Sequence, residues 1–184
     1  MVASNHLSSV DIVLLGFLDV PFRWVAKQAL YFVPILGWQL WALGHLSIRR
    51  GSKSSRRRFM ARAVRTLQAG MSILIFLEGT RSRTGNIKPF KPGAFLIASA
   101  AGKPLLPVVV SGTFNAMPPN SILLHNRIWA VVKVLEPVAV EGKTHEEIDK
   151  IMNDLRERMI REKQELDRES EVLHERWLLS LKQR

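Results

Sequence analysis

The chain has no cysteine among its 184 residues. Without cysteine it has no disulfide, no thiolate metal ligand and no cysteine nucleophile, and it suits a reducing compartment. Its apolar fraction of 47% is typical of a globular protein, and its length allows one domain with a substantial core.

Several motifs that would identify a chemistry are also missing. There is no G-x-S-x-G elbow for a serine nucleophile and no G-x-G-x-x-G dinucleotide fingerprint. No metal is expected, because His45, His125, His145 and His174 are not spaced as metal ligands. His45 follows an apolar run and is interpreted as a packed or capped histidine. Aromatic residues are not interleaved with the basic ones, which argues against a face for single-stranded nucleic acid.

The stretch 29–44 is almost entirely apolar but too short to cross a membrane, which takes roughly 20 apolar residues. Pro34 and Gly37 interrupt it. Burial in the core is the default interpretation. The alternative is an interfacial segment whose Trp38 and Trp41 lie at the headgroup level of a membrane. The first residues lack a basic region followed by a long apolar run, so no signal peptide is expected.

Acidic residues are scarce in most of the chain. Residues 1–142 hold seventeen Lys and Arg but only five acids, a net charge of +12, whereas residues 143–184 hold ten basic and eleven acidic residues, a net charge of −1. This asymmetry predicts an α/β domain over 1–142 and a charged helical extension over 143–184 that packs on the domain or projects from it. The basic excess indicates an anionic partner: nucleic acid, an anionic lipid surface or a phosphate-bearing substrate.

The alternation of apolar and amphipathic stretches predicts an α/β fold, with a central, mostly parallel or mixed sheet flanked by helices. Strands are expected at 2–4, 22–26, 46–48, 72–77, 105–110 and 128–134, with an extension at 138–140. Helices are expected at 8–18, 52–65 (basic and amphipathic), 93–101 and 144–182. The last begins with a capping box at 144–147. It should pack on the body as far as Met159, and its second half should be solvated, paired with a partner or frayed.

His6 and Asp11 lie five residues apart, after one apolar segment and before another. We expect His6 at the end of a strand and Asp11 in the first turn of the next helix, where the two side chains can meet. A carboxylate on one ring nitrogen fixes the tautomer and makes the other nitrogen a better base. The alternative is purely structural, because Ser8-x-x-Asp11 also reads as a helix N-cap with an acid at its third position. This stretch alone leaves both interpretations open.

A second polar segment, residues 78–85, follows the buried strand expected at 72–77. Its glycines, hydroxyls and arginines could enclose a phosphate, with Lys88 and Lys91 adding cations nearby. The alternative is a solvated turn with surface arginines. His6, Arg50 and Glu78 each follow an expected strand, and active sites in such sheets lie at the carboxyl ends of strands.

Four ordered blocks between residues 5 and 112 resemble the glycerolipid acyltransferases, in particular the lysophosphatidate acyltransferases. Asn5, His6, Ser8 and Asp11 match the family's N-H-x-S-x-x-D block. Gly44 and Arg50 match the second block, and residues 106–109 match the fourth. The third block, F-P-E-G-T-R-S, is matched by Phe76, Glu78, Gly79, Thr80, Arg81 and Ser82. Two positions depart from the pattern: Leu77 stands in place of the usual proline, and Arg49 in place of an acid or amide.

The resemblance implies transfer of a fatty acyl group from acyl-CoA or acyl-carrier protein to the free hydroxyl of lysophosphatidate, with no cofactor besides that thioester co-substrate. His6 would be the general base and Asp11 its orienting carboxylate. Pro107 would shape its strand rather than react. The substrate-binding residues implied are Arg50 and Arg81 for the phosphate, with Glu78, Gly79, Thr80 and Ser82 shaping the pocket.

The implied partners are a lysophospholipid acceptor, an acyl thioester donor that includes acyl-carrier protein, and an anionic membrane surface; nucleic acid is not expected. The protein would lie peripherally on the cytoplasmic face of the membrane, the inner membrane in a bacterium. Two alternatives remain: an acyltransferase for another lysolipid acceptor, or a non-catalytic basic module that binds membrane or nucleic acid through residues 49–65.

Overall fold

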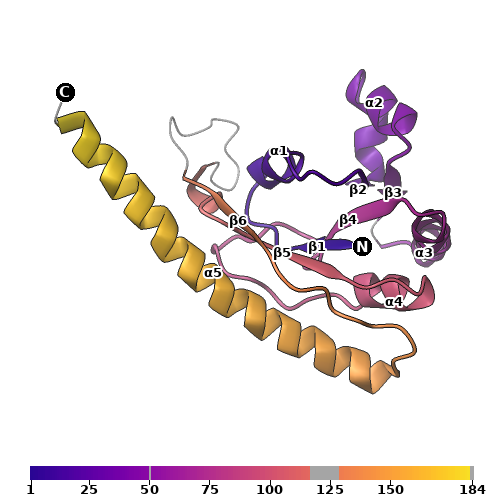
Figure 1. The fold of residues 1–184 in the computed structure, drawn as a ribbon. Coiled ribbons are helices and arrows are strands. Elements are labelled where there is room, and N and C mark those ends of the chain that lie inside the picture. Colours follow the sequence, from indigo (N-terminus) through magenta and orange to yellow (C-terminus); the bar gives the residue numbers. More distant parts are fainter. Residues whose placement is uncertain (50, 117–128, 183–184) are drawn as a thin grey trace.

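The computed structural model describes residues 1–49, 51–116 and 129–182, which form a sheet between two layers of helices (Figure 1). The strands are β1 (Val2–Ser4), β2 (Phe22–Lys27), β3 (Leu46–Ile48), β4 (Ser72–Phe76), β5 (Leu106–Ser111) and β6 (Val131–Val134). The helices are α1 (Val10–Leu15), α2 (Leu36–Ala42), α3 (Lys53–Gln68), α4 (Gly93–Ala100) and α5 (His145–Lys182), with short 3-10 turns η1 (Gln28–Phe32) and η2 (Phe114–Ala116).

The six strands are ordered β3-β2-β4-β1-β5-β6. The first five are parallel, and β6 runs antiparallel to β5 at the edge. The predicted α/β class and mostly parallel sheet are confirmed. Because β1 lies between β4 and β5, with Ser4 level with Phe76 and Val108, the chain leaves β1 where its neighbours also end.

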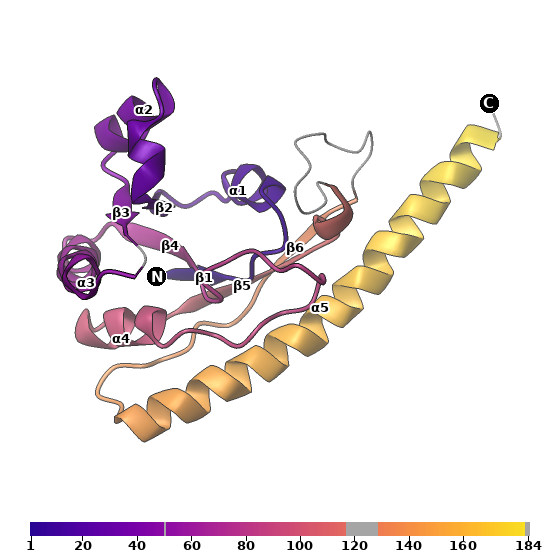
Figure 2. The ribbon, with the colours of Figure 1, turned by 180° about the vertical axis from the view of Figure 1, so that it is seen from behind.

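The central strands are covered on both faces, which explains their near-continuous apolar sequences. Neighbouring residues of β4 enter opposite cores: Ile73 packs with α3, α4 and α5, and Leu74 packs with Leu15 of α1. Figure 2 shows the same arrangement from behind, with α1 on one side of the sheet and α4 and α5 on the other.

The long C-terminal helix α5 begins with the predicted capping box. The Thr144 amide donates to the Glu147 carboxylate (2.8 Å), and the Glu147 amide donates to the Thr144 hydroxyl (3.2 Å). Its apolar contacts with the core continue past Met159 to Leu166, which is buried. Packing on the body therefore extends into the second half of the helix, further than the apolar pattern indicates.

The stretch 29–44 differs most from expectation. It forms η1 and α2, and the side chains of Trp38 and Trp41 are each 78% exposed, so the interpretation as a buried core segment is wrong. No helix in the described part of the chain is both long enough and apolar enough to cross a membrane.

Smaller differences concern the ends of elements. Helix α1 is shorter than the expected 8–18, and the expected extension at 138–140 contributes one bridge, between Leu105 and Val138. Strand β6 begins at Val131; the start of the expected strand, Ile128, lies outside the described residues, as do Arg50 and His125.

Candidate active site

Asn5 fastens the end of β1 to β5. Its side-chain amide donates to the Val110 carbonyl (2.9 Å), and its side-chain oxygen accepts from the Val110 amide (2.8 Å). The side chain is fully buried, so these two bonds satisfy polar atoms that would otherwise be costly to bury. The clamp fixes where the next residue, His6, leaves the sheet.

The structure brings His6 and Asp11 together as predicted. The Nδ1 atom of His6 lies 2.9 Å from Oδ2 of Asp11, and the same oxygen accepts from the amides of Leu7 (2.7 Å) and Ser8 (2.9 Å). Because a carboxylate only accepts hydrogen bonds, the proton of the neutral imidazole lies on Nδ1, and Nδ1–H donates a hydrogen bond to Oδ2 of Asp11. The Nε2 atom then carries the lone pair, and it has no partner among the described residues.

The helix-capping interpretation is met only in part. Ser9, not Ser8, occupies the N-cap of α1 and makes no capping bond with its side chain, whereas the Ser8 hydroxyl accepts from the Val10 amide at 3.5 Å. Asp11 does bind the amides of the turn before the helix, so it holds the turn and the imidazole at once.

Thr113 completes the surroundings of Asp11. Its buried hydroxyl donates to Oδ1 of Asp11 at 2.5 Å, across 102 positions in sequence. Sequence reasoning missed this residue. The available signal was the polar Ser111-Gly112-Thr113 segment directly after an apolar strand, at the edge of the sheet where His6 also lies.

The His6 ring is also held from β4. It stacks on Phe76 with 3.7 Å between ring centroids and 8° between planes, and the side chain is 13% exposed. The backbone amide of His6 donates to Oε1 of Glu78 (2.9 Å). Backbone, ring face and Nδ1 are therefore all fixed, while a small part of the side chain stays exposed.

Glu78 links the two loops of the site. While Oε1 accepts from His6, Oε2 accepts from the Lys88 amide (3.1 Å). Burial raises the pKa of Glu78, although both amide bonds and the nearby Lys88 charge oppose that shift. Gly79 follows with φ of +69°, a conformation that favours glycine, and lets the chain turn away from the strand.

The remaining loop residues divide into inward and outward ones. Ser82 is buried and donates to the Asn86 carbonyl (2.8 Å), while its amide donates to the His6 carbonyl (2.7 Å). Arg81 is exposed and donates from Nη1 to the Ser9 hydroxyl (2.8 Å) at the start of α1. Of the residues expected to bind substrate, Arg81 therefore lies beside the His6 turn, and Ser82 stabilises the loop from inside.

Lys88 binds the loop that carries Thr80 and Arg81. The Lys88 ammonium donates to the Thr80 carbonyl (2.8 Å), the Thr80 hydroxyl (2.6 Å) and the Arg81 carbonyl (2.7 Å). With these three acceptors the ammonium closes the loop. Lys91 is exposed, and its side-chain carbons lie against Gly79.

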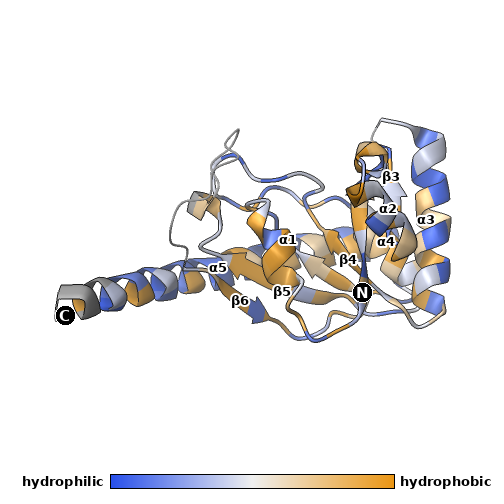
Figure 3. Ribbon diagram, turned by 90° about the horizontal axis from the view of Figure 1, so that it is seen from above, coloured by the Kyte–Doolittle hydropathy of each residue, from blue (hydrophilic) through white to orange (hydrophobic). Residues whose placement is uncertain are grey.

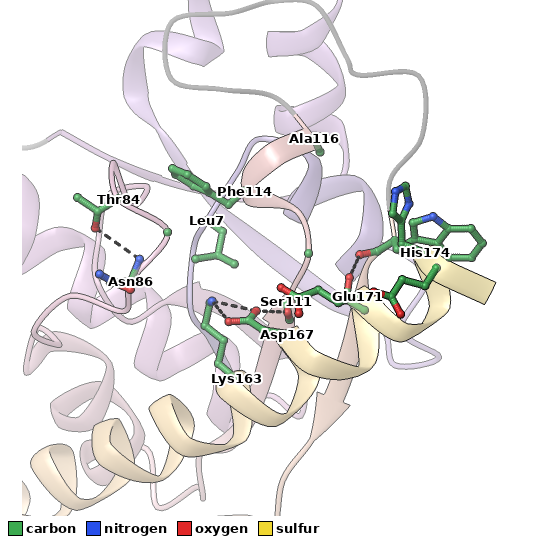
Figure 4. A pocket seen from close by; sticks show the side chains of 15 residues that line it. Leu7, Thr84, Asn86, Ser111, Phe114, Ala116, Lys163, Asp167, Glu171 and His174 are labelled. Carbon is green, nitrogen blue, oxygen red and sulfur yellow. Dashed lines mark hydrogen bonds and ion pairs between the residues drawn. The ribbon is translucent and has the colours of Figure 1, made fainter. Parts of the chain in front are cut away.

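A cavity of about 620 Å³ lies next to this site, between α5 and the loops after β4 and β5 (Figure 4). Leu7, the neighbour of His6, contributes to its wall, and Ser111, Lys163 and Asp167 are among its polar lining residues. The described residues contain no cluster of side chains suited to hold a metal ion.

His45 contacts the backbone of a neighbouring strand. Its Nδ1 accepts from the Trp24 amide (3.1 Å), and burial lowers its pKa.

The chain is thus an α/β protein in which a buried carboxylate orients a histidine at the carboxyl edge of a mostly parallel sheet, beside an arginine-bearing loop. The family model described as Acyltransferase matches residues 1–111. The chain belongs to this Acyltransferase family, which confirms the resemblance seen in its sequence blocks.

Individual relatives agree. The chain is 34% identical over 131 residues to a chloroplastic 1-acyl-sn-glycerol-3-phosphate acyltransferase of Brassica napus, covering 70% of this chain and 38% of that protein. It is 34% identical over 168 residues to the Escherichia coli 1-acyl-sn-glycerol-3-phosphate acyltransferase, covering 90% and 67%. The chain thus spans under two fifths of the plant relative.

A solved structure has the same fold. The crystal structure of the 1-acyl-sn-glycerophosphate acyltransferase PlsC from Thermotoga maritima superposes with a TM-score of 0.67 at 27% identity. The match covers 94% of this chain and 65% of that one.

Proposed function

We propose that the chain catalyses transfer of a fatty acyl group from a thioester, acyl-CoA or acyl-carrier protein, to the free hydroxyl of lysophosphatidate, giving phosphatidate. The observation that carries this proposal is the 2.9 Å contact between Nδ1 of His6 and the buried Asp11, which turns Nε2 into the available base. The names of the relatives support the choice of acceptor.

In this mechanism Nε2 of His6 takes the proton from the acceptor hydroxyl as its oxygen attacks the thioester carbonyl. A new C–O bond forms, the C–S bond breaks, and the departing thiolate takes the proton back from the imidazolium. Asp11 stays ionised and stabilises the imidazolium charge. The acyl group passes directly between the substrates, which suits a chain without cysteine or a serine elbow.

Arg81 is proposed to bind the acceptor phosphate. Its exposed guanidinium is anchored at Ser9, which lies between His6 and Asp11 in the sequence, and a guanidinium fork matches phosphate oxygens. Arg50 is proposed as a second phosphate ligand. Gly79 and Thr80 would shape the pocket, while Glu78 and Ser82 would act indirectly by holding the loop.

We also propose a peripheral position on the cytoplasmic face of an anionic membrane; an apolar surface on α1, η1 and α2 supports the contact with a membrane. Figure 3 shows apolar residues on α1 and around α2, beside the largely hydrophilic helix α3. The surface is formed by large side chains exposed by more than half: Val13, Phe17, Phe32, Ile35, Trp38, Trp41 and Leu43. The exposed arginines of α3 would add about 1 kcal/mol each near anionic headgroups.

The test is thiol release by the purified protein with acyl-CoA or acyl-carrier protein as donor, across a panel of lysolipid acceptors. We expect release that depends on lysophosphatidate and yields phosphatidate. Release with another lysolipid alone would reassign the acceptor. Vesicle binding without release from any donor–acceptor pair would favour the non-catalytic module, which the exposed cations of α3 would also suit.

A further inference from the structure

The turn after β5, residues 111–113, is held from helix α5. The buried Ser111 hydroxyl donates to Oδ1 of Asp167, and the ammonium of Lys163 pairs with the same carboxylate, 3.0 Å from Oδ1 and 2.7 Å from Oδ2 (Figure 4). A polar contact between two distant segments thus replaces the apolar packing seen earlier along this helix.

Gly112 brings this turn against the backbone of Trp129, which α5 also contacts. Its φ is +79°, and a Cβ atom there would lie 1.9 Å from the Trp129 carbonyl oxygen, so the two backbones approach closer than any side chain allows. The same carbonyl accepts from the hydroxyl of Ser170 (2.6 Å), three residues after Asp167 on α5. Asp167 therefore holds the turn directly through Ser111, and Ser170 holds the Trp129 backbone against which Gly112 packs.

The next residue of the turn is Thr113, whose hydroxyl binds Asp11 at 2.5 Å. Asp11 in turn holds Nδ1 of His6. A continuous set of short contacts runs from α5 through the 111–113 turn to the imidazole. A displacement of the turn would be transmitted to Asp11 because Thr113 and Asp11 are both fully buried.

We propose that Asp167 and Ser170 are positioning residues for the His6–Asp11 pair and act through the 111–113 turn. The expected effect of these residues on turnover rests on the proposed acyl transfer. Their expected effect on the position of the His6 imidazole does not depend on that reaction. Misplacement of catalytic groups by a distant change can cost as much as 100-fold in rate.

The variants to compare are Asp167→Ala and Ser170→Ala, with Glu162→Gln as matched control. Glu162 pairs with Lys133 of β6, so its replacement also removes a charged contact between α5 and the body but leaves the 111–113 turn untouched. We expect Asp167→Ala to lower kcat roughly tenfold or more with the KM values of both substrates little changed, Ser170→Ala to act in the same direction, and Glu162→Gln to leave kcat unchanged.

A readout of His6 separates this coupling from the proposed reaction. In protein labelled with ¹⁵N-histidine, the His6 Nδ1 proton should give a downfield signal protected by Asp11, assigned by its loss in His6→Ala. Asp167→Ala should speed its exchange with water. Asp167→Asn keeps an oxygen for the Ser111 hydroxyl. Unlike Asp167→Ala, it should retain both the protected signal and most of the wild-type kcat.

A double-mutant cycle with Thr113→Val tests whether Asp167 acts on the His6–Asp11 pair through Thr113. If Asp167 acts through Thr113, the Asp167→Ala, Thr113→Val double variant should be no slower than Thr113→Val alone. Additive losses, an unchanged His6 signal in Asp167→Ala, or equal effects of Asp167→Ala and Glu162→Gln would overturn the proposal. If the wild-type protein shows no acyl transfer at all, the proton exchange data still decide the coupling and the proposed function alone fails.

Discussion

The buried carboxylate of Asp11 accepts from four donors: the His6 ring, the amides of Leu7 and Ser8, and the Thr113 hydroxyl. Two of the three local donors are backbone groups of the kind a helix-entry acid binds, and the third is the imidazole that a catalytic carboxylate orients. The two interpretations of this stretch are therefore two aspects of one residue, and only substitution separates their consequences.

If His6 is the general base, His6→Ala should lower kcat by roughly 100-fold or more while the fold is retained. Asp11→Asn should lower both kcat and the melting temperature, because an amide can leave the imidazole in the wrong tautomer and provides one acceptor oxygen instead of two. Thiol release and circular dichroism melts on the same proteins measure the two effects.

The double variant provides the control for that pair. Since the two residues act as a unit, it should be little slower than His6→Ala alone. A purely structural turn predicts the opposite order, with a loss of stability in Asp11→Asn and near-wild-type turnover in His6→Ala. That second result would end the proposed mechanism.

Glu78 predicts a pH dependence of stability. Burial raises the folded-state pKa of its carboxyl, so the folded chain binds this proton more tightly than the unfolded chain does. Its contribution is fully present below the unfolded pKa and is lost as pH rises through the raised folded pKa. As pH rises through that window, the melting temperature of the wild type should therefore fall relative to that of Glu78→Gln. A constant difference between the two proteins at every pH would show that Glu78 is ionised without cost.

Arg81→Ala should weaken use of lysophosphatidate more than use of the thioester, seen as a raised KM for the acceptor. Arg81→Lys should restore this only in part, because the guanidinium fork is lost. Arg83→Ala, on the same loop and also exposed, is the matched control. A rise confined to the thioester KM would assign Arg81 to the phosphates of the donor instead.

The His6–Asp11 pair was predictable because both residues lie on one short segment. Thr113, Asp167 and Ser170 were not, because they reach the site only through the pairing of β1 with β5 and the packing of α5. Glu78 shows an intermediate case: its place at a strand end was predicted, but not that both oxygens face backbone amides.

At the scale of elements, the buried strands were predicted well because coverage on both faces leaves a continuous apolar run in the sequence. The stretch 29–44 has a similar composition but the opposite burial. Gly37 lies so close to the Tyr31 backbone that a Cβ atom would be 2.2 Å from that carbonyl oxygen. Helix α2 thus folds back on η1, and the segment presents its apolar side chains outward. Composition alone does not report what covers them.

This surface predicts membrane binding with two components. Co-sedimentation with anionic vesicles should fall as salt rises, because α3 supplies exposed arginines whose attraction is screened. It should fall further in Trp38→Ala with Trp41→Ala, which removes interfacial aromatic anchors. Leu179→Ala, at a side chain 60% exposed on α5, is the matched control and should bind as wild type does. Equal binding to neutral and anionic vesicles would eliminate the electrostatic component.

At the scale of the molecule, the charge distribution divides the chain into two parts, whereas the hydrophobic core joins them. The basic excess belongs to residues 1–142 and the balanced charge to residues 143–184, which predicts two parts. The hydrophobic core joins them, since Ile148, Leu155 and Met159 of α5 belong to the same buried cluster as Phe95 of α4. A helix that completes the core of the sheet domain should unfold with it, whatever its charge.

Met159→Ala tests this directly, because its side chain is fully buried. Removing it should cost about 2–5 kcal/mol, and for a chain of this length each kcal/mol lowers the melting temperature by roughly 2–4 °C. Far-ultraviolet circular dichroism, dominated by helix, and near-ultraviolet signals from the tryptophans should shift together as one transition. Leu179→Ala, exposed on the same helix, should change stability by less than about 0.5 kcal/mol. If the helical signal instead melted separately, with the tryptophan transition unmoved in Met159→Ala, residues 143–184 would be a unit that unfolds independently of the sheet domain.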